Sequence, residues 1–454
     1  MTNALVPGAA ARSGGGAPGR LAGRAGADGR LAGRAGADGC DPSLRLAVVG
    51  NPAGRRVRFF QDAVAAAGLP PARVVPWLDV LRGGARFTAG ETVRLDSPGE
   101  DPDVDRLLRG VEDTTRVEGT GLWYARFTSA VSELAAGVRA AGAVLVDDPG
   151  ELAVQFDKRL GHGVLRRAAV PVPASPTSGH DAPPVRGWDD VVRLMADAGT
   201  RRVFVKLAHG SSASGVLAVE TAPAGRVQAT TSVERGPGGA LFNSLRVRRY
   251  RTEREVASIV DALAPDGLHV ERWLPKASSG GRVADLRVVV VDGRATHAVV
   301  RTSRSPMTNL HLGGARGDLE AARGAVAAAG GRWEDVLGVA ERAAAAFPGT
   351  RCLGVDLLPS SDWRRVAVGE VNAFGDLLPG LTGLPGGGAE GLDTYAAQVA
   401  ALLRPTAPTP TAAPNATTST TSTTNTERNA TTAVTGTPRT TTALRPRPPG
   451  TSTT

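Results

Sequence analysis

The sequence predicts an α/β domain with a parallel sheet, followed by an α+β domain, with a disordered tail at each end. Strand and helix patterns alternate over residues 44–150, as in a parallel sheet with crossover helices. From residue 202 onward the pattern changes to a succession of short strands, which we expect to pair mostly antiparallel. Residues 1–43 and 405–454 are of low complexity. The second folded domain is therefore expected over residues 151–404.

In the first domain, Leu44 to Pro52 is predicted to be a buried strand that ends in turn residues. Val57 to Gly68 follows as a helix stopped by glycine, and ARVVPW as a second strand. A longer helix, at about residues 125–141, precedes a strand over Ala143 to Pro149. The stretch VVGNPAGRR is not a dinucleotide-binding glycine fingerprint, so no such role is assigned to it.

The second domain is expected to begin with a helix over residues 151–168. The strands expected after it are RVFVKLAH, GVLAVET, LHVERWL, ADLRVVVVDG, ATHAVVRTS, RCLGVDLL and RVAVGEVN. One long helix, at about residues 333–347, is expected to interrupt them. A Gly- and Arg-rich insert over residues 224–251 either shapes a substrate pocket or forms a surface hairpin.

The two tails differ in composition. The first contains a tandem repeat, LAGRAGADGR then LAGRAGADGC, and is predicted to be disordered or to be translated from a start codon placed too early. The second is mostly Thr, Pro, Ser and Ala. Neither can bury enough apolar surface to offset the entropy of ordering, so both are expected to be dispensable for chemistry.

Composition limits the classes of function. The net charge is +9, but the first 43 residues hold five Arg and three Asp, and the last 50 hold four Arg and one Glu. The rest carries about +4 and no nucleic-acid-binding motif, so we expect no nucleic-acid partner. Two cysteines without metal spacing, no membrane-length apolar run and no signal-peptide core favour a cytoplasmic protein without a membrane partner.

Lysine is rare in this chain. Of 53 basic residues all but three are arginine, and the exceptions are Lys158, Lys206 and Lys276. In RVFVKLAHGSSASGV, strand alternation places Phe204 and Lys206 on one face, just before a loop of small residues. Backbone N–H groups in such a loop can close on an anion, so the segment has the form of a phosphate clamp. An edge-strand lysine beside a plain hairpin is the alternative.

Two carboxylates and an amide are expected to converge near the end of the second domain. Asp356 and Glu370 are equally far in sequence from Trp363, so a hairpin turning there would bring them together. Asn372 is two residues beyond Glu370 and shares its face. Three such oxygen ligands suit Mg²⁺. A coincidental surface pair is the alternative, but both carboxylates lie in apolar strands, where an unpaired charge is costly.

Six segments follow one another along the chain: FDKRLGHGVLRRAAVPVPAS, VFVKLAHGSSASGV, LHVERWLP, ADLRVVVVDGRATHAVVRTSRSPMTNLHLGG, GVDLL and GEVNAFGDLLPG. In this order they resemble the ATP-grasp superfamily over about residues 44–400, nearest to its glutathione-synthetase-like and ribosomal-protein glutamate-ligase-like members. The resemblance implies an α/β domain followed by an α+β ATP-grasp fold whose two lobes clamp ATP. It implies nucleotide contacts from Lys158, Lys206, Gly210, Ser211, Ser212, Gly215, Glu271, Trp273 and Leu274.

The resemblance also implies Mg²⁺, as two ions and with Mn²⁺ as an alternative, on Asp356, Glu370 and Asn372. Arg287 and Arg301 would stabilise the charge that develops during catalysis. Lys276 has no match and is expected on the surface.

The function implied is an ADP-forming ligase that joins a small-molecule or peptide carboxylate to an amine through an acyl phosphate. A phosphotransferase of the same fold and a nucleotide-binding scaffold without turnover are the alternatives. Substrate identity and oligomeric state are not encoded in any motif.

Overall fold

The computed structural model describes residues 44–211, 213–375 and 378–404, which form three β-sheets. Both predicted tails and Ser212 lie outside these residues. None of the helices in the described part of the chain has the length and apolar character needed to cross a bilayer. The mixed helix and strand content predicted from the sequence is confirmed.

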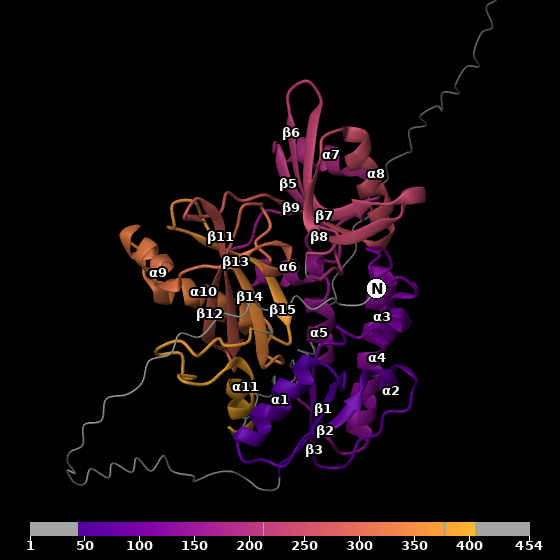
Figure 1. The fold of residues 1–454 in the computed structure, drawn as a ribbon, viewed down its shortest axis with the longest axis vertical. Coiled ribbons are helices and arrows are strands. Elements are labelled where there is room, and N and C mark those ends of the chain that lie inside the picture. Colours follow the sequence, from indigo (N-terminus) through magenta and orange to yellow (C-terminus); the bar gives the residue numbers. More distant parts are fainter. Residues whose placement is uncertain (1–43, 212, 376–377, 405–454) are drawn as a thin grey trace, which may run out of the picture. The chain divides into compact units, whose positions relative to one another are not determined.

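The first sheet has four parallel strands in the order β2-β1-β3-β4. Its central strand β1 is buried on both faces, as parallel strands usually are. Ala47 and Val49 pack toward α3 and α4, whereas Leu46 and Val48 pack toward α1 and α11, which lie side by side (Figure 1). The elements are β1 Arg45–Gly50, α1 Arg55–Ala66, β2 Arg73–Pro76, α2 Trp77–Leu81, β3 Glu91–Leu95, α3 Pro102–Arg109, α4 Thr120–Ala140, β4 Val144–Leu145 and, from the far end of the chain, α11 Thr394–Leu403.

The helix predicted over residues 151–168 is instead two helices, α5 Pro149–Gln155 and α6 Lys158–Arg167. Asp157 lies between them in extended conformation and accepts hydrogen bonds from the backbone N–H groups of Arg159 and Leu160. An N-cap side chain accepts hydrogen bonds from backbone N–H groups in the first turn, which have no partner within the helix. The Asp157 side chain thus favours the start of a new helix at this point. Lys158 thereby becomes the first residue of α6.

The second sheet is antiparallel, in the order β8-β7-β6-β5-β9, and its core packs against α7 and α8. The insert over residues 224–251 forms the β7–β8 hairpin at one edge. The sequence prediction missed α8, which follows that hairpin, so the long helix at residue 333 is not the only one among the strands. The elements are α7 Trp188–Asp197, β5 Arg202–Leu207, β6 Leu217–Ala222, β7 Arg226–Arg235, β8 Leu241–Tyr250, α8 Glu253–Leu263 and β9 Leu268–Arg272.

The third sheet is antiparallel, in the order β13-β12-β11-β14-β15, with β10 beside β11. Along β11, Leu286 and Val288 pack in the core that includes α10 (Figure 1). Since side chains alternate along a strand, Asp285 and Arg287 point to the opposite face. The elements are β10 Ser278–Ser279, β11 Arg282–Val291, β12 Arg294–Ser303, β13 Ala315–Arg316, α9 Leu319–Ala328, α10 Trp333–Ala345, β14 Cys352–Pro359 and β15 Val366–Ala373.

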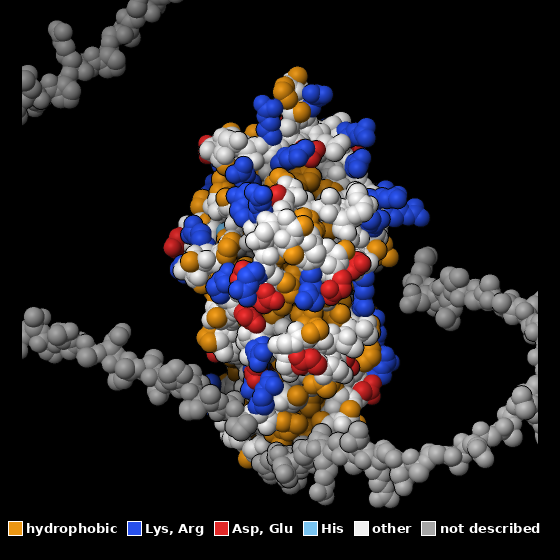
Figure 2. Space-filling model, turned by 90° about the vertical axis from the view of Figure 1, so that its left-hand side faces the viewer, with side chains coloured by type: hydrophobic (Ala, Val, Ile, Leu, Met, Phe, Trp, Pro, Cys, Tyr) orange, Lys and Arg blue, Asp and Glu red, His pale blue; other side chains and the backbone are white. Residues whose placement is uncertain are grey.

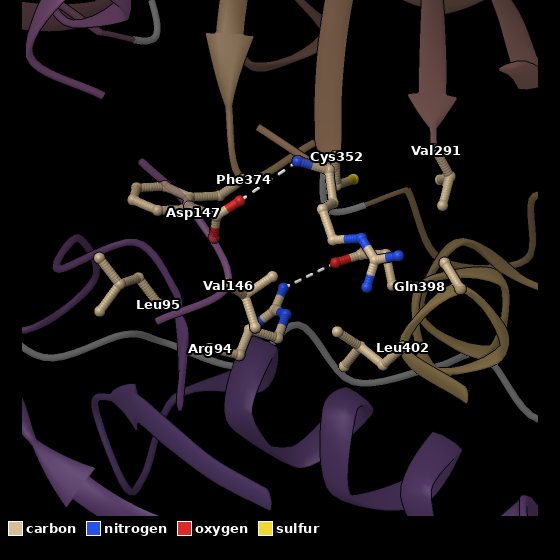
Figure 3. Close-up of a pocket in the computed structure, with 11 residues that line it drawn as sticks. Arg94, Leu95, Val146, Asp147, Val291, Cys352, Phe374, Gln398 and Leu402 are labelled. Carbon is tan, nitrogen blue, oxygen red and sulfur yellow. Dashed lines mark hydrogen bonds between the residues drawn. The ribbon is translucent and has the colours of Figure 1, made fainter. Parts of the chain in front are cut away.

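A small polar cluster is buried where α11 meets the first and third sheets (Figure 3). Arg94 of β3 pairs with Asp96 at 2.8 Å and donates a hydrogen bond to Gln398 of α11, also at 2.8 Å. Burial raises the pKa of the Cys352 thiol to about 12, so the thiol stays protonated and unreactive at neutral pH. The space between these side chains is about 20 Å³, far too small for a substrate.

Asp147 is the residue of this cluster whose negative charge opposes folding. Burial raises its pKa to about 6, although Arg94 acts against the shift. A carboxyl group whose pKa rises on folding takes up its proton first in the folded state, so its ionisation opposes folding above pH 6. This cost shrinks as the pH falls toward the pKa of the unfolded chain.

We expect Asp147→Asn, which keeps the shape and removes the titration, to gain stability over wild type as the pH rises. The difference in unfolding free energy should grow by about 1.4 kcal/mol between pH 5 and pH 8, given a folded pKa near 6. Urea denaturation of both proteins across that range measures it. The buried histidines titrate in both proteins and cancel. A difference independent of pH would show that Asp147 does not titrate in this range.

Candidate active site

A cavity of about 630 Å³ gathers most of the predicted site residues. Those lining it are Lys158, Lys206, Gly210, Ser211, Glu271, Leu274, Arg287, Arg301, Asp356, Glu370 and Asn372. Gly215 and Trp273 do not line it, and Ser212 lies outside the described residues. Residues separated by more than 200 positions in the chain therefore meet at one concave site.

Lys206 and Glu271 form a buried ion pair on neighbouring strands. β5 and β9 pair antiparallel, and Lys206 Nζ lies 2.5 Å from Glu271 Oε1. Burial alone would raise the pKa of Glu271, but Lys206 and His269 lower it to about 2. Burial would lower the pKa of Lys206, but Glu271, followed by Glu370, raises it. Both groups are therefore charged at neutral pH, and the ammonium group of Lys206 lines the cavity while its side chain is largely shielded from solvent.

Lys158 joins three parts of the site. Its Nζ lies 3.0 Å from Glu370 Oε1 and donates a hydrogen bond to the carbonyl of Gly210 at 2.5 Å. Its backbone N–H donates to the carbonyl of Ala208 at 2.9 Å. The first residue of α6 is thus fixed to the loop that follows β5, so the two lysines found in separate motifs flank the same loop.

The loop after β5 depends on two glycines. Gly215 has a φ of 67°, and a Cβ placed there would lie 2.4 Å from a methyl group of Leu207. A Cβ at Gly210 would lie 2.9 Å from the carbonyl oxygen of Ser214. The loop therefore closes tightly on itself, and the role of Gly215 is to shape the loop from outside the cavity.

Four charged residues form a ladder across the third sheet. Asp285 on β11 is the register partner of Arg301 on β12, and Arg287 on β11 is that of Asp356 on β14. Arg287 forms an ion pair with Asp356, whose Oδ2 also lies 3.1 Å from an Nη of Arg301. Arg301 Nε donates to Asp285 Oδ1 at 2.9 Å. Asp356 is thus neutralised by one arginine from β11 and one from β12, and Asp285 by Arg301 from the neighbouring strand β12.

The predicted oxygen ligands meet at the same place. Asp356 and Glu370 are register partners across the β14–β15 hairpin, as their spacing about Trp363 predicted. Burial would raise the pKa of Asp356, but Arg287 and Arg301 hold it below its usual value, so the side chain stays an ionised oxygen donor. Asn372 lines the cavity with them. Among the described residues no three His, Cys, Asp or Glu side chains cluster as a metal site, so the set is two carboxylates and an amide, which fits Mg²⁺.

Two residues of the segment that follows β9, Trp273 and Lys276, lie elsewhere than the sequence predicted. Trp273 does not line the cavity: its ring is tilted against that of Phe204, with the ring centroids 5.2 Å apart, and the guanidinium of Arg202 lies over it. Lys276, expected on the surface, lines the cavity with a side chain only 7% exposed and pairs with Asp285 at 3.2 Å. The rarity of lysine in this chain was the signal that could have identified it.

Comparison with known proteins gives a limited result. No protein-family model and no curated protein matches the chain. The ATP-grasp ligase PsnB, complexed with minimal precursor, Mg and ADP, is 17% identical over 80% of this chain and 99% of its own, with a TM-score of 0.44. The D-cycloserine synthetase DcsG is 17% identical over 79% and 98%, with a TM-score of 0.46. A RimK domain ATP-grasp protein from Sphaerobacter thermophilus DSM 20745 is 17% identical over 79% and 99%, at 0.41. At such identities and TM-scores, function has to be inferred from the cavity's own residues.

We expect Glu271→Gln to lower the free energy of unfolding by about 3 kcal/mol, because it leaves the buried Lys206 without its nearest counter-ion. The double variant Lys206→Met/Glu271→Gln should lose less than the sum of the two single variants, since neither charge is then left alone. Urea denaturation of the four proteins measures the coupling. Additive losses would mean that the pair does not interact in solution.

Proposed function

We propose that this protein binds ATP in the cavity and uses it to activate a substrate carboxylate as an acyl phosphate, which an amine or similar nucleophile then attacks. One observation carries the proposal. Lys158 and Lys206 flank a small-residue loop, and beside them the same cavity holds an oxygen-ligand set and two arginines. Phosphoryl transfer needs cations that bind the phosphates, oxygen donors that hold Mg²⁺ and arginines that stabilise an anionic transition state.

In this proposal the nucleotide lies along the segment that follows β9 and the loop that follows β5. Lys158 and Lys206 exchange their carboxylate partners for phosphate oxygens, and the backbone of Gly210 and Ser211 closes over them. Leu274 offers an apolar contact for the base. Among the described residues, the lining of the cavity extends from this end to Arg55 and Arg56 of α1, which leaves room for a second reactant.

Asp356, Glu370 and Asn372 would hold Mg²⁺, as one or two ions and with Mn²⁺ as an alternative, and the metal would supply charge neutralisation at the phosphates. The protein's own residues then position the reactants. Arg287 turns from Asp356 toward the substrate, and Arg301 turns only its Nη groups, since its Nε stays on Asp285; both then neutralise the charge that develops on the transferred phosphoryl group.

The reaction has two balanced steps. A carboxylate oxygen of the substrate bonds to the γ-phosphorus of ATP while the bond to the β–γ bridging oxygen breaks, so ADP leaves with the electron pair. The amine nitrogen then bonds to the acyl carbon, phosphate leaves with the electron pair of the C–O bond, and the nitrogen loses a proton. Substrates would be a small-molecule or peptide carboxylate and an amine, and a cytoplasmic setting would supply the ATP.

We expect Mg·ATP to raise the melting temperature of the wild-type protein and Lys206→Ala to lose most of that gain, because ligand binding stabilises the folded state by mass action. The affinity of the variant should fall at least about 10-fold, since a charged hydrogen bond is lost. Arg202→Ala is the matched control: it lies on the same strand, pairs with Glu220 and does not line the cavity. A thermal shift that is absent in wild type, or equal in all three proteins, would contradict a nucleotide site at Lys206.

We expect Arg287→Met to keep Mg·ATP binding but to lower turnover about 100-fold or more, because a preorganised donor to the developing charge is lost. The assay is ADP release while carboxylate and amine pairs are screened, with mass spectrometry of the product. A ligated product identifies the ligase. A phosphorylated product without ligation would identify a phosphotransferase and overturn the proposal.

A further inference from the structure

All three lysines of the chain lie in the wall of one cavity. Among the described residues nine basic side chains line the cavity, and every other basic residue of the sequence is an arginine. On the face that Figure 2 shows, basic side chains occur both beside acidic ones and apart from them. An exposed charge can be arginine or lysine with little consequence, so lysine at these positions indicates a need for a compact ammonium ion on a flexible stem.

Lys276 is built into the wall in the same way as the other two. Its backbone forms an isolated antiparallel bridge with Ser360, just beyond β14, which fixes the base of the side chain. Its Nζ lies 3.2 Å from Asp285 Oδ2 and 3.4 Å from Thr308 Oγ1. Lys158 on Glu370 and Lys206 on Glu271 show the same arrangement, an ammonium held by one wall carboxylate.

Asp285 pairs with two cations, Lys276 and Arg301, so it can lose one of them and still be neutralised. Arg301 also donates to this carboxylate, at 2.9 Å. If Lys276 turned away, Asp285 would remain paired, so the usual penalty for leaving a buried charge alone would not apply in full. The ammonium of Lys276 is therefore the partner that can leave.

We propose that the ammonium group of Lys276 binds a phosphate oxygen of the nucleotide in this cavity, as a third lysine beside Lys158 and Lys206. The inference rests on the proposed function, since it requires a nucleotide at this site. Lys276 exchanges one anion, Asp285, for another, and Arg301 keeps Asp285 neutralised. A guanidinium at this position is bulkier and planar, so it should serve less well.

Calorimetric titration of Mg·AMPPNP into the full-length protein tests this inference. We expect Lys276→Met to raise Kd about 10-fold or more, as loss of a charged hydrogen bond does, and Lys276→Arg to raise it less. Arg282→Met is the matched control: it removes a positive charge from the same strand as Asp285, outside the cavity, where Arg282 donates to Thr302. Its Kd should equal that of wild type.

Lys276→Met alone removes the proposed contact with the nucleotide and also leaves Asp285 with one cation fewer. The double variant Lys276→Met/Asp285→Asn removes the contact without leaving an additional negative charge in the cavity. A Kd that stays high in the double variant supports a direct contact with the nucleotide. A Kd restored to the wild-type value, or unchanged in Lys276→Met, would overturn the inference while leaving the proposed function intact. Wild-type protein that does not bind Mg·AMPPNP would overturn both.

Discussion

The cross-strand pairing of Arg287 and Arg301 with Asp356 is the interaction on which the rest of the site depends. A carboxylate in an apolar strand is costly unless it is paired, and these arginines occupy the two strands next to β14 on one side. Packing of Val288 and Val355 against the α10 side of the sheet fixes the register, since a slip of one residue would turn Asp356 into that core. The apolar face of the sheet thus determines the charged one.

Each lysine of the cavity forms an ion pair with a carboxylate of the cavity wall. Lys206 on Glu271 shows the principle: each charge stabilises the other while both are largely withdrawn from water. A phosphate that takes the place of Glu271 meets a cation that is already desolvated and oriented, so binding has less reorganisation to offset. The same reasoning applies to Lys158, which also donates a hydrogen bond to the carbonyl of Gly210 and so links the position of the loop to Glu370, one of the proposed metal ligands.

Local patterns in the sequence sufficed for most of the strands and for the pairing of Asp356 with Glu370, because strand alternation and hairpin symmetry are short-range properties. They missed β3, Glu91–Leu95, which lies inside the first sheet. They failed where a single contact decides the outcome. The helix break at Asp157 comes from a capping side chain inside a helix-like pattern. Trp273 was expected at the nucleotide but packs on Phe204, and Lys276 was expected on the surface but pairs with Asp285. These contacts join segments whose spacing no periodicity encodes.

With only three lysines in the chain, nucleotide binding at Lys158 and Lys206 can be measured directly. Protein labelled with ¹³C at lysine Cε, with any purification tag removed, should give three side-chain NMR signals, each assigned by one Lys→Arg variant. If the nucleotide binds at these lysines, Mg·AMPPNP will shift the signals of Lys158 and Lys206 in proportion to its occupancy. Bound nucleotide that leaves both signals unmoved would contradict binding at these lysines.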